Sequence, residues 1–323
     1  MKLAALVAAA SVPLLAAGAA PARAPAAAPE TPDPQQPKLA LFLFNLSDFL
    51  GDVKGSFQRV AYDRAHAEAY VWGGRDIQVF GGSGMQIYSF GSAQGLHSVY
   101  SIAPLPSGDL IVSQIGPSGP EIVRCNYRGE VTGPFTPTAL PPGVTLGYDE
   151  IRYADGKLWF LTQGAYRVVA TDEDGRYLFT RDLTKAISAG MEADQEPDTS
   201  EVEITGFDVD EQGNVLVTIA AQFRAISVSP DGVGHPFGGK GSRPGKFNVA
   251  GPIARDERGY YFVADTLRSV VMVFAPDLKF LFEFGGRGET PGHLVIPSSI
   301  AVGNGMVFVS QARNRGVSVF RLQ

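Results

Sequence analysis

Short runs of hydrophobic residues, each bounded by residues that favour turns, recur along most of the chain. Residues 244–285 show the repeating unit most clearly, because four apolar runs follow one another with polar corners between them. The runs occupy residues 249–254, 261–264, 270–274 and 280–284. Arg258-Gly259 and Pro276-Asp277 supply two of the turns, so the stretch predicts a meander of four short strands. A sheet of this size cannot bury both faces alone, and we expect it to stack on copies of itself.

Six copies of this unit can be marked along the chain. In each, a turn precedes the second strand, and a run of apolar residues without alternation follows it. The turns are Ala67-Glu68, Ser107-Gly108, Asp155-Gly156, Gln212-Gly213, Arg258-Gly259 and Asn304-Gly305, and the runs begin at Tyr70, Leu110, Leu158, Val215, Tyr261 and Val307. Runs without alternation predict strands that are covered on both faces, as between neighbouring sheets. The pattern therefore predicts an all-β fold, a six-bladed β-propeller over residues 38–323.

The sixth copy ends at Gln323, just after its third strand. Residues 39–45, LALFLFN, have apolar residues at alternate positions and are similar to the fourth strand of the fifth copy, KFLFEFG. We expect this N-terminal strand to pair outside the strand at residues 317–320. That pairing would close the ring and cover the sheet edges that an open array exposes.

The stretch at residues 244–285 resembles the NHL repeat. The positions that match its signature are Gly245, Phe247, Pro252, Ile253, Ala254, Asp256, Gly259, Phe262, Val263, Ala264, Asp265, Thr266 and residues 271–274. A second copy keeps Pro297, Ile300, Ala301, Gly305, Phe308 and Val309, but has Ser310-Gln311 where the signature has Asp-Thr. The resemblance implies a six-bladed propeller of NHL type, as found in exported bacterial NHL-repeat proteins.

The N-terminal region differs from the rest in composition. Lys2 is followed by an apolar, alanine-rich run over residues 3–20 that Pro13 interrupts and that ends in small residues. This favours a signal peptide at residues 1–19 over a membrane anchor or a disordered tail. Residues 20–37 are rich in Ala and Pro and predict a linker. We therefore expect a periplasmic or secreted protein whose mature chain has no membrane span.

Charge and cysteine content narrow the function further. The net charge of −6 argues against nucleic acid as a partner, because phosphate affinity comes mostly from Lys and Arg. Cys125 is the single cysteine, so the chain has no internal disulfide, and it has no CxxCH motif for covalent haem. We expect Cys125 to be a buried free thiol in a strand.

Two long insertions, at residues 135–147 and 183–203, lie between blades. They emerge on the face that also carries the turns between second and third strands, called the inter-blade-loop face below. Elaborated loops on a rigid scaffold are common binding sites. A ring of candidate binding residues lies at these turns: Trp72, Arg75, Gln114, Gln163, Tyr166, Arg167, Gln222, Phe223, Arg224, Asp265, Arg268, Gln311 and Arg315.

Two interpretations of this ring remain open. Aromatic and arginine side chains around a channel mouth are typical of interface anchors. In the NHL family the Asp of the repeat commonly pairs with such an Arg, but only Asp265 is kept here, so most of these arginines lack that partner. The other interpretation is therefore that the ring forms internal hydrogen bonds, to the backbone and to Gln side chains. A basic patch and an acidic patch flank the ring and would orient a partner, unless the acidic stretch is simply a solvated loop. The patches are Lys240, Arg243, Lys246 and Arg287, and Glu192, Asp194, Glu196, Asp198, Glu201 and Glu203.

An enzymatic site is the alternative. Among six-bladed propellers, NHL-like amidating lyases hold zinc with histidines and lactonases hold calcium with Glu, Asn and Asp. The four histidines here, His66, His97, His235 and His293, are spread over a turn, two inter-blade loops and an outer strand, and do not predict a common metal. Inward carboxylates are available in two blades only, as Asp149, Glu150 and Asp208.

We therefore expect no catalytic residues, no metal site and no cofactor. The sequence favours an exported, non-catalytic binding scaffold. Its partner would be a protein of the cell envelope, either a redox protein or a surface assembly. The competing hypothesis is a metal-dependent propeller enzyme, lyase-like or lactonase-like, with its site in the central channel.

Overall fold

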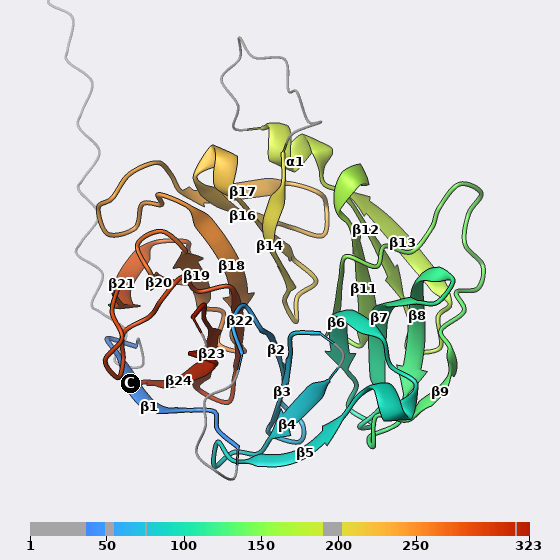
Figure 1. Ribbon diagram of the computed structural model, residues 1–323. Coiled ribbons are helices and arrows are strands. Elements are labelled where there is room, and N and C mark those ends of the chain that lie inside the picture. The colour runs from blue at the N-terminus through green and yellow to red at the C-terminus, as the bar shows by residue number, and fades with distance from the viewer. Residues whose placement is uncertain (1–36, 49–54, 75, 190–201, 314) are drawn as a thin grey trace, which may run out of the picture. The chain divides into compact units, whose positions relative to one another are not determined.

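The computed structural model describes residues 37–48, 55–74, 76–189, 202–313 and 315–323, which belong to one compact unit, Pro37–Gln323. This unit contains six four-stranded antiparallel sheets arranged as the blades of a propeller (Figure 1). The predicted fold class is confirmed. The predicted signal peptide at residues 1–19 and most of the predicted linker at residues 20–37 lie outside the described residues, as do Arg75 and the acidic positions from Glu192 to Glu201.

The strands of each blade follow one another along the chain. Blade 1 consists of β2 (Arg59–Asp63), β3 (Glu68–Trp72), β4 (Ile77–Phe80) and β5 (Gln86–Phe90). Blade 2 consists of β6 (Ser98–Pro104), β7 (Leu110–Gly116), β8 (Gly119–Cys125) and β9 (Val131–Pro134). Blade 3 consists of β10 (Glu150–Ala154), β11 (Lys157–Thr162), β12 (Arg167–Thr171) and β13 (Tyr177–Asp182).

The second half of the unit repeats this order. Blade 4 consists of β14 (Ile204–Val209), β15 (Val215–Ile219), β16 (Arg224–Val228) and β17 (Gly234–Gly238). Blade 5 consists of β18 (Ala250–Arg255), β19 (Tyr261–Asp265), β20 (Val270–Phe274) and β21 (Phe280–Gly285). Blade 6 consists of β22 (Ser299–Gly303), β23 (Met306–Ser310), β24 (Val317–Leu322) and, from the N-terminal side, β1 (Ala40–Asn45).

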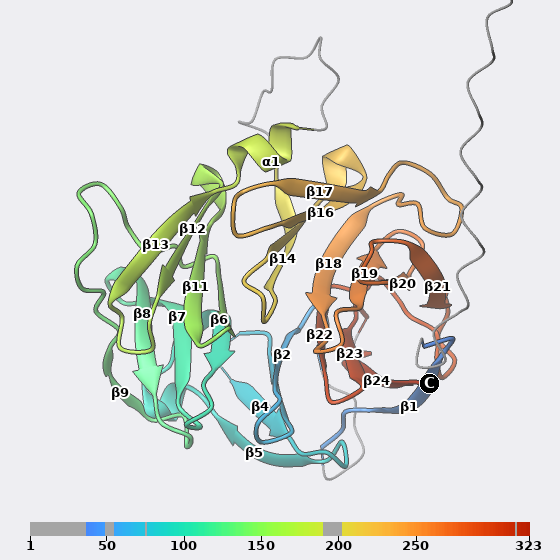
Figure 2. The same ribbon diagram turned by 180° about the vertical axis from the view of Figure 1, so that it is seen from behind.

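The N-terminal strand closes the ring as the sequence predicts. β1 pairs antiparallel with β24, with Ala40 opposite Leu322 and Asn45 opposite Ser318, and the two strands lie side by side in Figures 1 and 2. The Phe42 and Phe320 rings pack edge to face at 5.7 Å between centroids. The Ser318 hydroxyl donates a hydrogen bond to Asn45 Oδ1 at 2.7 Å, so the two ends of the propeller are joined by both apolar and polar contacts.

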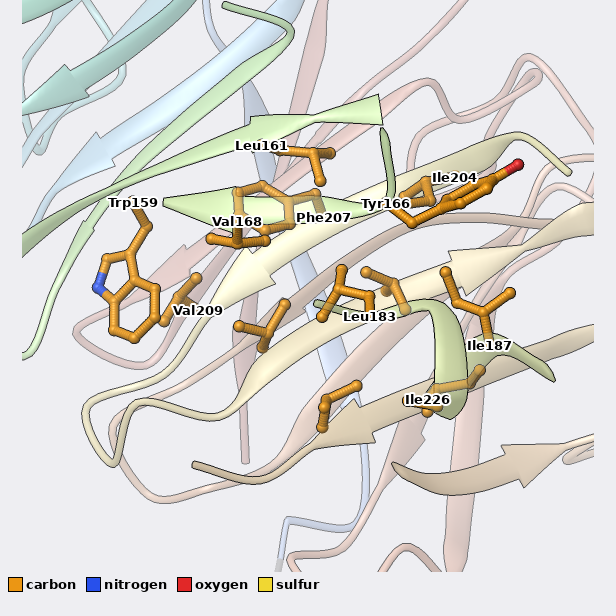
Figure 3. Close-up of a cluster of buried hydrophobic side chains, with 14 of the residues drawn as sticks. Trp159, Leu161, Tyr166, Val168, Leu183, Ile187, Ile204, Phe207, Val209 and Ile226 are labelled. Carbon is orange, nitrogen blue, oxygen red and sulfur yellow. The ribbon is translucent and has the colours of Figure 1, made fainter. Parts of the chain in front are cut away.

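The second strand is the most buried strand of most blades, and in blades 4 and 5 the third strand is nearly or fully buried as well. Every residue of β15, β19 and β20 is buried, which confirms the interpretation of the uninterrupted apolar runs. The hydrophobic core is divided into clusters that lie between neighbouring blades. Figure 3 shows one of them, in which Trp159 and Leu161 of blade 3 pack with Phe207 of blade 4.

Short helices occur only in the connections of the described chain. They are three 3₁₀ turns, Ser92–Gln94, Gln163–Ala165 and Ala220–Gln222, and the helix α1 (Thr184–Ser188). We expected the insertion at residues 183–203 to be a loop, but its first part forms the short helix α1. Ala186 and Ile187 of α1 are buried with Leu183 against the cluster between blades 3 and 4, because the sequence places these apolar residues on one side of a single turn (Figure 3). No helix within the described ranges has the length and apolar character needed to cross a membrane.

Candidate functional site

The first strands of the six blades line a central channel. They are the inner end of every sheet, and β2, β6, β10, β14, β18 and β22 contact their neighbours around the ring. Each first strand starts at the inter-blade-loop face. It ends at the opposite face, called the hairpin-turn face below, which carries the turns between first and second strands and between third and fourth strands. Side chains that point inward from these strands therefore form the candidate site.

A chain of alternating charges crosses the channel. Arg59 at the start of β2 contacts Glu150 at the start of β10, with Nη1 at 2.5 Å from Oε1. The other oxygen of Glu150 accepts a hydrogen bond from Arg152 Nη1 at 2.9 Å. Arg152 Nε in turn lies 3.6 Å from Oδ1 of Asp208 on β14. These four side chains link blades 1, 3 and 4 through the channel, and Arg152 stands between two carboxylates.

Asp208 occupies the deepest position of this chain. Its Oδ2 accepts a hydrogen bond from the Arg255 backbone N–H at 3.0 Å. Burial raises the pKa of the Asp208 carboxyl above its ordinary value, since desolvation outweighs the opposing effect of Arg152 and Arg64. The side chain keeps 17 % of its surface exposed, and it lines a cavity, so it remains accessible inside the propeller.

A second ion pair lies at the hairpin-turn end of the channel. Arg64, just after β2, contacts Glu211 at 2.9 Å between Nη1 and Oε1. Its guanidinium also donates to the backbone carbonyls of Val302 at 3.3 Å and Arg255 at 3.1 Å. Arg64 thus connects blade 1 with blades 4, 5 and 6.

Two cavities share the channel, one at each end. The larger, of about 400 Å³, is at the hairpin-turn end and receives residues from all six first strands. The smaller, of about 100 Å³, is at the inter-blade-loop end and is lined by Arg59, Trp72, Glu150 and Thr205 among others. Arg152 lines both cavities, as do Val60 and Ile300.

Several residues of the predicted ring bond to the backbone of the protein itself. Gln114 Oε1 accepts from the His97 N–H at 2.8 Å, and Gln311 Oε1 accepts from the Val295 N–H at 2.8 Å. Asp265, at the equivalent position of blade 5, accepts from the Asn248 N–H at 2.7 Å. In three blades, therefore, the residue at or near the end of the second strand holds the loop that enters that blade.

The aromatic members of the ring lie at different depths. Trp72 is buried, lines the smaller cavity and directs Nε1 toward the Tyr100 carbonyl at 3.4 Å. Tyr166 is buried and its hydroxyl donates to the Val202 carbonyl at 2.6 Å. Phe223 is half-buried and carries Lys240 Nζ at 5.1 Å from its ring centroid.

The remaining ring residues are polar and spread around the face. Gln163 donates from Nε2 to the Ile204 carbonyl at 3.3 Å. Arg268 contacts Glu283 at 2.5 Å, and it is the Arg268 backbone N–H, not its guanidinium, that Asp265 binds. Burial lowers the pKa of Arg224, and half-buried Arg167 starts β12. The amide of Gln222 and Nε of Arg315 are buried without a hydrogen-bond partner among the described residues. The ring therefore does not converge on one point.

The exposed apolar residues of the inter-blade-loop face were not singled out from the sequence as a group. Phe57, Tyr100, Ile115, Tyr148 and Leu267 all have exposed side chains, and each lies in or beside a connection on this face. The rings of Tyr100 and Tyr148 pack edge to face at 6.5 Å between centroids, and Tyr148 lies two residues before Glu150, which pairs with Arg59. The face thus presents aromatic surface beside charge.

The carboxylates considered for a metal site are divided by the structure. Glu150 and Asp208 line the channel, while Asp149 accepts a hydrogen bond from the Gln163 N–H at 2.8 Å. Within the described ranges, no group of three or more His, Cys, Asp or Glu side chains is arranged to hold a metal ion. The arginines that neutralise the channel carboxylates, Arg59, Arg64 and Arg152, were missed at the sequence level. The signal that could have revealed them was that each arginine lies in or directly after a predicted first strand.

Comparison of the structure with solved structures supports the fold. A streptogramin B lyase matches with a TM-score of 0.59 and 11% identity, over 89% of this chain and 100% of that chain. An auxiliary nutrient binding protein from Bacteroides thetaiotaomicron matches with 0.58 and 13%, over 89% and 77%. A gluconolactonase from Xanthomonas campestris matches with 0.55 and 14%, over 84% and 88%. No protein-family profile matches the sequence, and no curated protein is significantly similar to it. Identities this low show a shared propeller fold and nothing more specific.

Proposed function

We propose that this protein is an exported, non-catalytic propeller of NHL type that binds a protein partner of the cell envelope through its inter-blade-loop face. The apolar N-terminal run followed by an Ala/Pro-rich stretch supports export. The partner would be a redox protein or a surface assembly. A nutrient-binding protein on the same fold is consistent with a binding role, although this is an analogy at the level of the fold.

The observation that carries the proposal is the exposed aromatic and apolar surface around the channel mouth. Leu267 is 55 % exposed, Tyr148 41 % and Tyr100 38 %. Protein interfaces are enriched in aromatic and arginine side chains at their centres. Arg59, whose side chain is 41 % exposed, starts β2 on the same face and adds a cation to it.

A basic patch on two matching loops extends this surface over blades 5 and 6. The loop after β17 carries Lys240, Arg243 and Lys246, and the loop after β21 carries Arg287, all with exposed side chains. Both loops have the same backbone hydrogen bonds. Phe247 N–H donates to Gly239 at 2.8 Å and Leu294 N–H donates to Gly286 at 2.9 Å, and both side chains are fully buried. The cations are therefore held on rigid loops, as a preformed docking surface requires.

Site-specific photo-crosslinking in the native cell envelope tests the proposal. A photoreactive phenylalanine analogue at position 267 should capture one discrete partner band. The same analogue at Tyr127, which is 63 % exposed on the hairpin-turn face, is the matched control and should not. Capture from both positions, or from neither, would contradict the proposed face. An unlabelled protein added in excess should compete for the band if the contact is specific.

A further inference from the structure

The larger channel cavity has the size and wall composition of a small-molecule site. Its volume of about 400 Å³ lies within the range of ordinary ligand pockets. Much of its wall is aliphatic, with Val60, Ile102, Val209, Ile300, Ala301 and Val302 among the lining residues. The cavity opens at the hairpin-turn face, the end of the channel opposite the proposed partner surface.

The arginines that line this cavity already donate to groups of the protein. Arg152 gives hydrogen bonds to Glu150 and to the backbone carbonyls of Ile151 at 2.9 Å and Phe207 at 3.0 Å. Arg64 donates to Glu211 and to two backbone carbonyls. An anionic ligand would have to displace these contacts.

Asp208, in contrast, has acceptor capacity to spare. The backbone N–H groups of Arg255 and Val209 act on this carboxylate, the former at Oδ2, but the nearest cationic atom to Oδ1 is Arg152 Nε at 3.6 Å, which is beyond hydrogen-bond distance. Tyr62, on the same wall, accepts a hydrogen bond from Asn304 at 3.1 Å through its hydroxyl oxygen. A ligand that brings an N–H donor to Oδ1 would complete the hydrogen bonding of this carboxylate.

Carboxylates outnumber cations among the charged residues that line the cavity. The carboxylates are Asp63, Asp208 and Glu211, and the cations are Arg64 and Arg152. A lining with an excess of negative charge favours a cationic ligand over an anionic one.

We propose that this cavity binds a small organic amine, with the ammonium group on Asp208 Oδ1 and the apolar body against the aliphatic wall. Calcium or magnesium fits the site less well, because these ions need six or more oxygen ligands and Asp208 supplies only one deep carboxylate. This site is separate from the partner surface and goes beyond the proposed function. Its ligand and the protein partner would occupy opposite ends of the propeller.

Calorimetric titration of the purified protein tests this with phenethylamine and two analogues of similar shape, 2-phenylethanol and phenylacetate. The amine should bind once per chain, at least about tenfold more tightly than the neutral or the anionic analogue, since a charge-assisted hydrogen bond contributes roughly one factor of ten or more. Isopentylamine serves as a second, aliphatic probe. Failure of both amines to bind, or equal affinity for amine and alcohol, would overturn the proposal.

Amine binding to variants of the cavity tests where the ligand lies. Asp208→Asn should weaken amine binding at least about tenfold, because the amide carries no charge to pair with the ammonium. Asp155→Asn removes the same charge from the rim but not from the cavity wall, and it should leave the affinity within about twofold. Ala301→Leu fills the cavity while leaving Asp208 in place, and it should also weaken binding, so the site stays testable if Asp208→Asn folds poorly. Unchanged binding in the cavity variants would refute the assignment, whatever the photo-crosslinking shows.

Discussion

Arg152 and Asp208 lie next to each other in the channel, with Nε and Oδ1 3.6 Å apart, on the first strands of neighbouring blades. Because Arg152 also binds Glu150 and the Phe207 carbonyl, one guanidinium satisfies groups on two first strands. Channel side chains of a propeller can serve a ligand or hold the blades together. Here Arg152 holds neighbouring blades together, while Asp208 has an oxygen that is available to a ligand.

Removing the guanidinium should therefore destabilise the propeller. Arg152→Met keeps much of the side-chain volume but leaves Asp208 without its nearest cation and frees one oxygen of Glu150, and we expect a loss of about 3 kcal/mol in the free energy of unfolding. Arg313→Met is the matched control, since Arg313 contacts Glu289 at 3.9 Å with both side chains about 70 % exposed, and it should cost less than about 0.5 kcal/mol. Chemical denaturation measures both. Equal losses would show that the channel pair has no special role.

The raised pKa of Asp208 predicts a specific dependence of stability on pH. Between the ordinary carboxyl pKa and the raised value, the folded protein holds a proton that the unfolded chain releases, so this residue's contribution to stability falls as the pH rises through that window. Arg152, Arg64 and the Arg255 N–H face the carboxyl and limit the shift. The sign is opposite to that of Asp277, whose pKa is lowered by its hydrogen bond with Lys279.

Comparing the wild type with Asp208→Asn isolates this effect from the other carboxylates. The stability of the wild type relative to the variant should decrease from acid toward neutral pH and then level off. Melting temperatures measured at closely spaced pH values give the curve. A difference that stays constant, or that grows with pH, would mean that Asp208 ionises at or below its ordinary pKa.

The closing strand should contribute strongly to stability through its inward side chains. Phe42→Ala removes the ring that packs on Phe320, and we expect a loss of about 2 kcal/mol, below the full cost of a buried Phe because Phe42 is half-buried. Leu41→Ala, one residue away and 42 % exposed, should change stability by less than about 0.5 kcal/mol. Deleting residues 38–46 should abolish cooperative unfolding. A deleted protein that melts like the parent would show that the ring does not need this strand.

Much of the propeller could be predicted because each blade repeats the same burial. Second strands such as β19 are covered on both sides, so their sequence is apolar for most of its length, and turns such as Arg258-Gly259 mark every blade. The closure could be predicted for the same reason, since Phe42 and its neighbours have the apolar alternation of a fourth strand.

The channel was harder to predict, because its contacts join residues that are far apart in the sequence. Arg59 and Glu150 are 91 positions apart, and no local pattern links them. A polar residue on a first strand can point into the channel or toward a neighbouring blade, and this depends on the twist of six strands together. The Gln114 and Gln311 pattern was visible in the sequence, but only the structure shows that both side chains hold backbone N–H groups.

Cys125 should be unreactive in the folded protein. The thiol is fully buried, as expected from its place in a strand, and burial raises its pKa to about 12, so almost no thiolate is present at neutral pH. Iodoacetamide should label the native protein at least about a hundredfold more slowly than the denatured chain, because labelling then requires transient opening. Mass spectrometry of timed samples gives both rates. Rapid labelling of the native protein would mean that blade 2 opens readily.

Metal analysis of the purified protein separates the binding scaffold from the metal-dependent enzyme. We expect zinc and calcium well below one equivalent per chain, because both oxygens of Glu150 are already held by the Arg59 and Arg152 guanidinium groups. A divalent cation would have to displace these groups from Glu150, and Asp208 by itself offers too few oxygens for calcium. Arg152→Met removes the competing cation and is the variant in which weak metal binding would first be detected. One tightly held metal per wild-type chain, lost together with Glu150→Gln or Asp208→Asn, would instead favour catalysis in the channel.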